Sequence, residues 1–317
     1  MQKKEDKTPI IFGPVPSRRL GRSIGINNIP TKYCSYSCIY CQVGRTNHML
    51  ITREEFYKPE KIVSEINKKL KKLKKDTNID YLTFISDGEP TLDINISKTI
   101  KLLKPIGIKL AIVTNSSLMW ESKVREDLID LDLVSVKIDS VIPELWKKVN
   151  RPSGHLNLRK ILTGIEIFAG TYGGRLITET MLVENYNDNI SSVIETAEFI
   201  KELNPYKAYI LTPTRPPAES FVKPPAEEKL MLAQQIFKEI TENVKTVNEF
   251  EGTDFSFSSD VRKELLSIMS VHPMRDDAVK EFLNKSNNDE KIIDEMISNN
   301  LIKKINYNNS SYFVKTN

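Results

Sequence analysis

Short apolar runs and longer amphipathic stretches alternate along residues 23–212. The runs hold four to eight residues, many of them β-branched, which predicts buried strands. The stretches repeat apolar residues at three- and four-residue steps, which predicts helices. The predicted strands are 23–27, 81–85, 109–114, 133–138, 176–183 and 208–211, and the predicted helices are 60–74, 94–103, 121–130, 158–169 and 190–203.

Strands that alternate with helices of this length predict an α/β fold, with a parallel sheet and right-handed crossovers. Six such units exceed a minimal sheet and fall short of an eightfold barrel, so we expect a partial (β/α)6 barrel. Active sites of parallel α/β folds lie at the carboxyl ends of the strands. The polar or small residues expected at or near those ends are Asp87, Gly88, Glu89, Asn115, Lys137, Asp139, Glu179 and Arg215.

The chain after the sixth strand has a different composition. Residues 213–225 contain five prolines, which block helix continuation and stiffen the chain. We therefore expect an N-terminal segment at 1–22, a core domain at 23–212, a proline-rich linker with a helix at 213–257, and a C-terminal domain at 258–317.

The C-terminal domain has a pattern of its own. Helices are predicted at 277–284 and 289–299, and strands at 301–305 and 312–315 flank an asparagine-containing loop, which favours a β-hairpin. The order helix, helix, hairpin is similar to a winged helix-turn-helix, in which Lys303, Lys304 and Lys315 could contact phosphate. A protein-interaction or capping role is the alternative.

Composition narrows the class of protein. The 317 residues carry a net charge of +4, which is well short of an obligate nucleic-acid binder. No apolar run approaches the roughly 18 residues of a membrane span, and the first residues lack an apolar signal core. The three cysteines are odd in number and lie in one loop, which argues against a secreted disulfide scaffold. We expect a cytoplasmic protein with no membrane partner.

The cysteines are the main candidate for chemistry. Cys34, Cys38 and Cys41 have the spacing C-x3-C-x2-C, and no other cysteine follows. Three thiolates within eight residues can surround one metal centre and leave one position without a protein ligand. Because an iron–sulfur cluster usually has four cysteine ligands, the loop implies either an outside ligand or a different metal. Zinc with His48 as the fourth ligand is one such alternative.

With Tyr40 at the aromatic position, the loop resembles the C-x3-C-x-aromatic-C motif of the radical SAM superfamily. The resemblance implies a [4Fe-4S] cluster on Cys34, Cys38 and Cys41, with S-adenosylmethionine on the fourth iron. It further implies one-electron cleavage of that cofactor to a 5′-deoxyadenosyl radical, which abstracts hydrogen from a substrate. A reducing electron donor such as flavodoxin or ferredoxin is implied as a partner.

A second match follows the second predicted strand. The family has a glycine-rich turn ending in a glutamate that contacts the methionine ammonium, and residues 87–89 read Asp-Gly-Glu. Gly88 permits close backbone approach, whereas Asp87 replaces the usual first glycine. The resemblance implies that Tyr40, Asp87, Gly88, Glu89, Asn115, Lys137 and Asp139 bind the cofactor.

Four further stretches, at 13–23, 134–139, 149–152 and 212–217, resemble the Fe–S oxidoreductase group related to wybutosine-synthesis enzymes. The wybutosine enzymes carry a second cluster on three more cysteines, which this chain lacks, so we do not expect their reaction. The same relatives suggest a nucleotide or an RNA base as the substrate. The candidate substrate residues are Arg18, Arg19, Glu179 and Arg215.

Two other classes of protein remain open at this point. A zinc-binding winged-helix regulator of nucleic acid would account for the cysteines and the C-terminal domain, but not for the six strand–helix units or the turn at 87–89. An electron-transfer or scaffold protein would hold a cluster without catalysis. The sequence favours a radical SAM enzyme.

Overall fold

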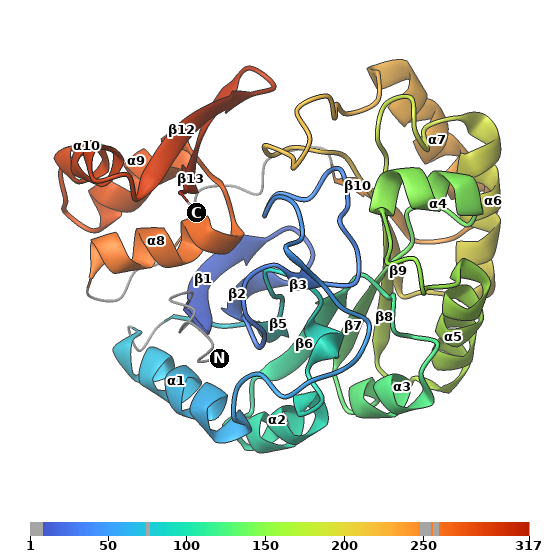
Figure 1. Ribbon diagram of the computed structural model, residues 1–317, viewed down its shortest axis with the longest axis horizontal. Coiled ribbons are helices and arrows are strands. Elements are labelled where there is room, and N and C mark those ends of the chain that lie inside the picture. Colours follow the sequence, from blue (N-terminus) through green and yellow to red (C-terminus); the bar gives the residue numbers. More distant parts are fainter. Residues whose placement is uncertain (1–8, 74–76, 248–254, 256–259, 317) are drawn as a thin grey trace.

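A curved eight-stranded sheet forms the centre of the protein in the computed structural model, which describes residues 9–73, 77–247, 255 and 260–316. All neighbouring strands pair in parallel except the first two, which are antiparallel (Figure 1). In sheet order the strands are β1 (Ile11–Ser17), β2 (Gly21–Ile26), β5 (Tyr81–Phe84), β6 (Lys109–Thr114), β7 (Leu133–Lys137), β8 (Arg175–Met181), β9 (Lys207–Leu211) and β10 (Val244–Val247).

Helices cover the convex face of this sheet (Figure 1). The main apolar core lies between the two layers, because alternate strand residues such as Leu110, Ile112, Val134 and Val136 point toward the helices. The helices are α1 (Pro59–Lys72), η1 (Pro90–Leu92), α2 (Ile96–Leu103), η2 (Lys104–Ile106), α3 (Ser122–Leu128), α4 (Pro143–Asn150), α5 (Leu158–Thr171), α6 (Ile190–Glu202) and α7 (Glu227–Ile240).

The predicted α/β partial barrel is confirmed, and each of the six expected strands has an observed counterpart. Sequence analysis missed the two edge strands of the sheet. β1 contains Gly13, Pro14 and Pro16, which argue against a strand except at an edge. β10 has only four residues. Helix α4 was also missed.

The concave side of the sheet holds a smaller second layer of side chains. The turn between β1 and β2 enters this space, and Leu20 at its tip is buried there. Ser17 fixes the turn by accepting hydrogen bonds from the backbone N–H groups of Arg19 and Leu20. The apolar partners of Leu20 come from six strands: Tyr81, Ala111, Leu133, Ile177, Tyr209, Leu211 and Val247.

The C-terminal region (260–316) contains the expected two helices and hairpin, preceded by a helix and a short strand that were not predicted. Asn308 and Asn309 form the hairpin turn with φ values of 45° and 58°, the left-handed conformation that asparagine tolerates. The elements are α8 (Val261–Val271), β11 (Met274–Arg275), α9 (Asp276–Lys285), α10 (Lys291–Ser298), β12 (Ile302–Tyr307) and β13 (Ser310–Lys315).

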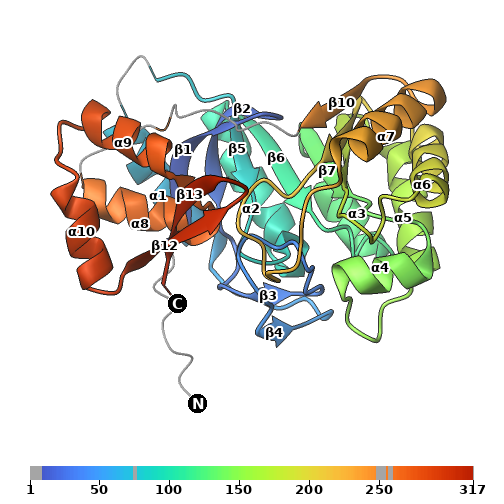
Figure 2. The ribbon, with the colours of Figure 1, turned by 90° about the horizontal axis from the view of Figure 1, so that it is seen from above.

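The C-terminal region lies against β1 at one edge of the sheet (Figures 1 and 2). Phe12 and Val15 of β1 belong to its apolar core, and Lys69 of α1 makes a buried ion pair with Glu264 of α8 at 2.6 Å. The domain boundaries remain a prediction, and the expected boundary at 257/258 lies outside the described residues. No helix in the described ranges combines the length and apolar character that crossing a bilayer requires.

Candidate active site

The three cysteines lie in the connection between β2 and α1, which we call the cysteine loop (residues 33–50). The two short strands β3 (Tyr33–Cys34) and β4 (His48–Met49) pair in parallel and hold its ends together. All three thiols are free and partly buried. The side-chain amides of Asn115 and Asn150 each donate to a sulfur at 3.4 Å, to Cys34 and Cys38 respectively.

The surroundings of the three thiols are compatible with an iron–sulfur cluster. Burial raises the pKa of Cys34 far above its usual value and that of Cys38 to about 12, so protons must leave these thiols when a metal binds. Lys32 lies beside them, and its buried Nζ has no hydrogen-bond partner among the described atoms. A buried donor of this kind fits the sulfides and thiolates of an iron–sulfur cluster.

The zinc alternative finds no support in this geometry. In the described part of the chain, no three Cys, His, Asp or Glu side chains converge as the ligands of a single ion do. His48, the proposed fourth ligand, is exposed and stacks on the ring of Tyr33 with 4.3 Å between centroids.

The turn at 87–89 packs directly against the cysteine loop. A Cβ atom at Gly88 would lie 1.7 Å from the carbonyl oxygen of Tyr33, so only glycine fits. The N–H of Glu89 donates to the same oxygen at 3.0 Å. Asp87 accepts from the hydroxyl of Thr31 at 3.2 Å, and its own carbonyl accepts from the N–H of Lys32. The turn therefore fixes the start of the loop.

The Glu89 carboxylate is fully buried and fully engaged. It accepts hydrogen bonds from the N–H and hydroxyl of Thr91, the hydroxyl of Thr114 and the N–H of Asn115, at 2.6–3.0 Å. Burial raises the pKa of Glu89, and these donors oppose the shift. The carboxylate thus joins the ends of β5 and β6, which leaves the backbone of the turn as the part that can meet a ligand.

Lys137 is the last residue of β7, and Asp139 lies two residues beyond the end of the strand, yet both side chains contact Tyr40. Lys137 reaches the cavity, with Nζ 5.0 Å from the ring centroid of Tyr40. Asp139 is buried and accepts from the Tyr40 hydroxyl, from Asn150 at 2.6 Å and from the N–H of Met181 at 2.9 Å. Asp139 holds the cysteine loop against β8.

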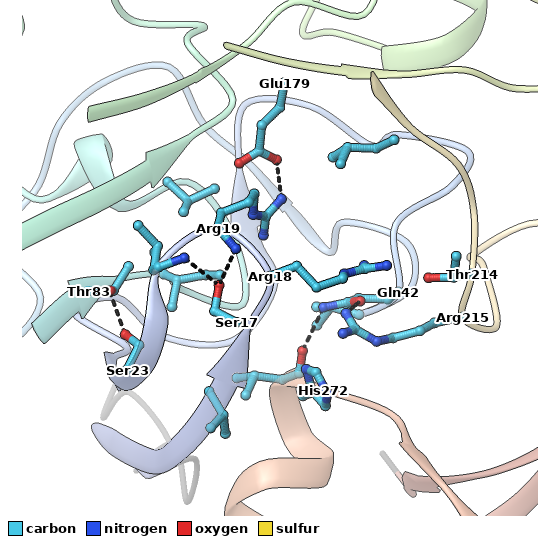
Figure 3. Close-up of a pocket in the computed structure, with 18 of the residues that line it drawn as sticks. Ser17, Arg18, Arg19, Ser23, Gln42, Thr83, Glu179, Thr214, Arg215 and His272 are labelled. Carbon is cyan, nitrogen blue, oxygen red and sulfur yellow. Dashed lines mark hydrogen bonds and ion pairs between the residues drawn. The ribbon is translucent and has the colours of Figure 1, made fainter. Parts of the chain in front are cut away.

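A cavity of 270 Å³ opens beside the cysteine loop, on the concave side of the sheet (Figure 3). It gathers the four candidate substrate residues, together with Tyr40, Cys41 and Lys137. Asp87, Gly88, Glu89, Asn115 and Asp139 are not among its described lining residues; they contact the cysteine loop or the residues just before it.

Two of the candidate substrate residues bind each other. Arg19 donates to Glu179 at 2.6 Å, and the hydroxyl of Ser135 donates to the other Glu179 oxygen at 2.5 Å. This pair forms part of the cavity wall, together with Leu20.

Sequence reasoning missed several residues that complete the site. Gln42 follows Cys41 and contacts the cavity, while His272 reaches it from the end of α8. Lys32 and Asn150 support the thiols. The sequence offered one indication that Lys32 and Gln42 belong to the site, which is that each lies within two residues of a cysteine. Asn150 lies within a stretch that carried the family resemblance, and His272 comes from a segment with no readable motif.

Comparison with known proteins decides the family. The model of the radical SAM superfamily matches residues 28–200. This chain belongs to the radical SAM superfamily. It is 49% identical over 308 residues to UPF0026 protein MJ1312 of Methanocaldococcus jannaschii, covering 96% of each chain. It is accordingly an enzyme of the radical SAM class, which uses a [4Fe-4S] cluster and S-adenosylmethionine.

Two solved structures share the fold. A radical SAM methyltransferase from Sphaerobacter thermophilus superposes with a TM-score of 0.53 at 13% identity, over 71% of this chain and 66% of that one. A TYW1 structure with a lysine–pyruvate adduct bound superposes with a TM-score of 0.52 at 14% identity, over 69% and 74%. These likenesses concern the barrel architecture alone.

Proposed function

We propose that this radical SAM enzyme acts on a substrate held in the cavity between the β1–β2 turn and the cysteine loop. Cys34, Cys38 and Cys41 would hold the cluster. When bound, cluster and S-adenosylmethionine supply a 5′-deoxyadenosyl radical that abstracts a hydrogen atom. The observation that carries the proposal is the position of the cysteines, whose loop contributes Cys41 to a cavity that is also lined by cationic side chains.

The chain's own residues would position the reactants and exclude water. Asn115 and Asn150 orient the sulfur ligands through their amide donors, and Lys32 offers a further donor. Lys137 and Tyr40 form the wall of the cavity next to Cys41 and are placed to contact the cofactor. Glu89 would hold the start of the loop through Tyr33, and Asp139 would hold its middle through Tyr40.

For the substrate, we favour a nucleotide over an RNA base. The hairpin that would serve as a nucleic-acid wing packs against the proline-rich segment of the same chain. The hydroxyl of Tyr307 donates to the carbonyl of Pro213 at 3.2 Å. The hydroxyl of Tyr312 donates to the carbonyl of Thr214 at 2.7 Å. Lys304 is paired with Asp276 at 3.1 Å. Both contacts fit the capping role for the C-terminal region better than RNA binding.

The proposed electron donor is a flavodoxin or ferredoxin in the cytoplasm. The outer side of the cysteine loop exposes Arg45, His48 and Met49, which offers such a donor a surface close to the proposed cluster.

The test is anaerobic reconstitution of the wild type and of a variant with all three cysteines replaced by alanine. The wild type should bind about four irons per chain, as a cubane cluster requires, and release 5′-deoxyadenosine when given dithionite and S-adenosylmethionine. The triple variant should do neither. Wild-type protein that takes up no iron, or that holds a cluster without cleaving the cofactor, would refute the proposal.

A further inference from the structure

The wall of the cavity carries an excess of positive charge. Arg18, Arg19, Lys137 and Arg215 line it, and Glu179 is the one carboxylate among the described lining residues. That carboxylate is 1% exposed and already engaged with Arg19 and Ser135. The charges of Glu179 and Arg19 therefore offset each other. The remaining positive charge of the cavity wall comes from Arg18, Lys137 and Arg215.

The β1–β2 turn sends its two arginines in different directions. Since Ser17 accepts from the N–H groups of Arg19 and Leu20, the backbone of the turn is fixed. Arg19 points toward Glu179, whereas Arg18 extends across the cavity toward Gln42 and Arg215 (Figure 3). Arg18 is only partly buried, and its guanidinium lies at the cavity wall.

Arg215 is positioned by a relay of hydrogen bonds. Its Nη1 donates to Oε1 of Gln42 at 2.5 Å, and Nε2 of Gln42 donates to the carbonyl of Val271 at 3.0 Å. The second bond fixes the orientation of the Gln42 side-chain amide, because the carbonyl oxygen of Val271 can only accept and must therefore face Nε2. Pro213 and Pro216 on either side stiffen the backbone that carries Arg215. Gln42 follows Cys41, so the relay places Arg215 next to the proposed cluster.

We propose that Arg18 and Arg215 form an anion clamp for the phosphate or carboxylate group of a small substrate. This deepens the proposed function and rests on it. A guanidinium presents its donors as a planar fork that matches two oxygens of such a group. Gln42 acts as the positioning residue for Arg215. Arg19 is not part of the clamp, although it is adjacent to Arg18 in sequence.

The cavity suits a small molecule, because the C-terminal region forms part of its wall and limits the space. Val271 and His272 form part of its wall, and Tyr312 of β13 holds the segment that carries Arg215. The cavity measures 270 Å³, which suits a compact metabolite and leaves no room for a folded polymer.

The experiment is calorimetric titration of the anaerobic, cluster-loaded enzyme at saturating S-adenosylmethionine, so that probes cannot occupy the cofactor's own carboxylate site. Pyrophosphate and malonate serve as the phosphate and carboxylate probes. At least one should bind saturably, and the tighter of the two identifies the kind of anion. Arg18→Gln and Arg215→Gln should each weaken that binding about tenfold or more. Arg159→Gln, which removes the same charge from the exposed face of α5, should not.

A second measurement covers the case in which a variant fails to fold. Phenylglyoxal modification of the wild type, mapped by mass spectrometry, should slow at Arg18 and Arg215 when the binding probe is present and stay unchanged at Arg159. The clamp is refuted if neither probe binds saturably, if both variants bind as the wild type does, or if no protection appears. Release of 5′-deoxyadenosine by the wild type is measured separately, so the clamp can fail while the proposed function stands.

Discussion

Arg19 and Glu179 form an ion pair inside the barrel, with Nη1 and Oε2 2.6 Å apart, although 160 residues separate them in the chain. The pair joins the β1–β2 turn to β8 across the concave side of the sheet. Both residues are candidates for substrate binding, which stays a prediction, and the structure joins them in a contact with each other. One consequence is that Arg18, the neighbour of Arg19, is the arginine of the turn that reaches across the cavity.

The first prediction concerns this pair. Replacing Arg19 by Met leaves the Glu179 charge buried with only Ser135 as a donor, so the free energy of unfolding should fall by about 3 kcal/mol. Changing both residues, Arg19→Met with Glu179→Leu, should cost less than the sum of the single changes. Urea unfolding of the four proteins in the cycle measures the coupling.

The exposed pair Arg262–Glu295 is the control for that cycle, with side chains 44% and 57% exposed. Its coupling should stay below about 1 kcal/mol. Equal coupling energies for the two pairs would show that the internal pair is no more than a surface contact.

Lys32 supplies the second prediction, which depends on the proposed cluster. Its Nζ is a buried donor without a partner among the described atoms, so it is available to the sulfurs of the cluster. Because donors to the sulfurs stabilise the reduced state, Lys32→Met should lower the reduction potential. Potentiometric titration followed by EPR measures the shift, and Lys71→Met on the exposed face of α1 is the matched control. Indistinguishable potentials in the two variants would remove Lys32 from the site.

The third prediction is a pH dependence. Burial raises the pKa of Asp93, at the end of η1, from 3.8 to about 6. Between about pH 4 and pH 6 the folded state therefore holds a proton that the unfolded state has lost, and the free energy of unfolding falls as the pH rises. Asp93→Asn should remove this slope, so the variant gains stability relative to the wild type across that window.

Denaturant unfolding at several pH values between 4 and 7 tests the prediction. Asp130→Asn is the control, because Lys104 lowers the pKa of that exposed carboxylate and its stabilisation is lost as the pH falls. A slope of the same sign in both comparisons would contradict the assignment to Asp93.

The fourth prediction concerns the contact between the C-terminal region and the proline-rich segment. Tyr312→Phe removes the donor to the Thr214 carbonyl and should cost about 1 kcal/mol, because that carbonyl loses its partner in a partly buried place. Amide hydrogen exchange in β12 and β13 should become faster, while exchange in β5 to β8 should not change. Tyr206→Phe, at a ring that is 52% exposed, is the control. Unchanged exchange in the hairpin would mean that the hydroxyl does not hold it.

The sequence was most informative where local periodicity sets the structure. Strands such as 109–114 follow from short β-branched apolar runs, since their length and composition favour a strand buried on both faces of a parallel sheet. The helices between them follow from residues repeating at three- and four-residue steps. β1 was missed because its glycine and prolines contradict a strand by themselves, and it forms because β2 offers an edge on which they are tolerated.

The residues of the site likewise fall into those that the sequence indicated and those whose roles depend on the tertiary structure. The spacing of Cys34, Cys38 and Cys41 by itself indicated one metal centre with a position open to an outside ligand, because a short loop fixes how close three thiols can come to one another. The superfamily and its cofactors were implied by the resemblance of this motif to a known family, which the family comparison confirms. The partition of the cationic residues was decided only by the tertiary structure. Which arginine meets Glu179, and which faces Gln42 and Val271, depends on distant segments packing together, and no local pattern in the chain encodes those contacts.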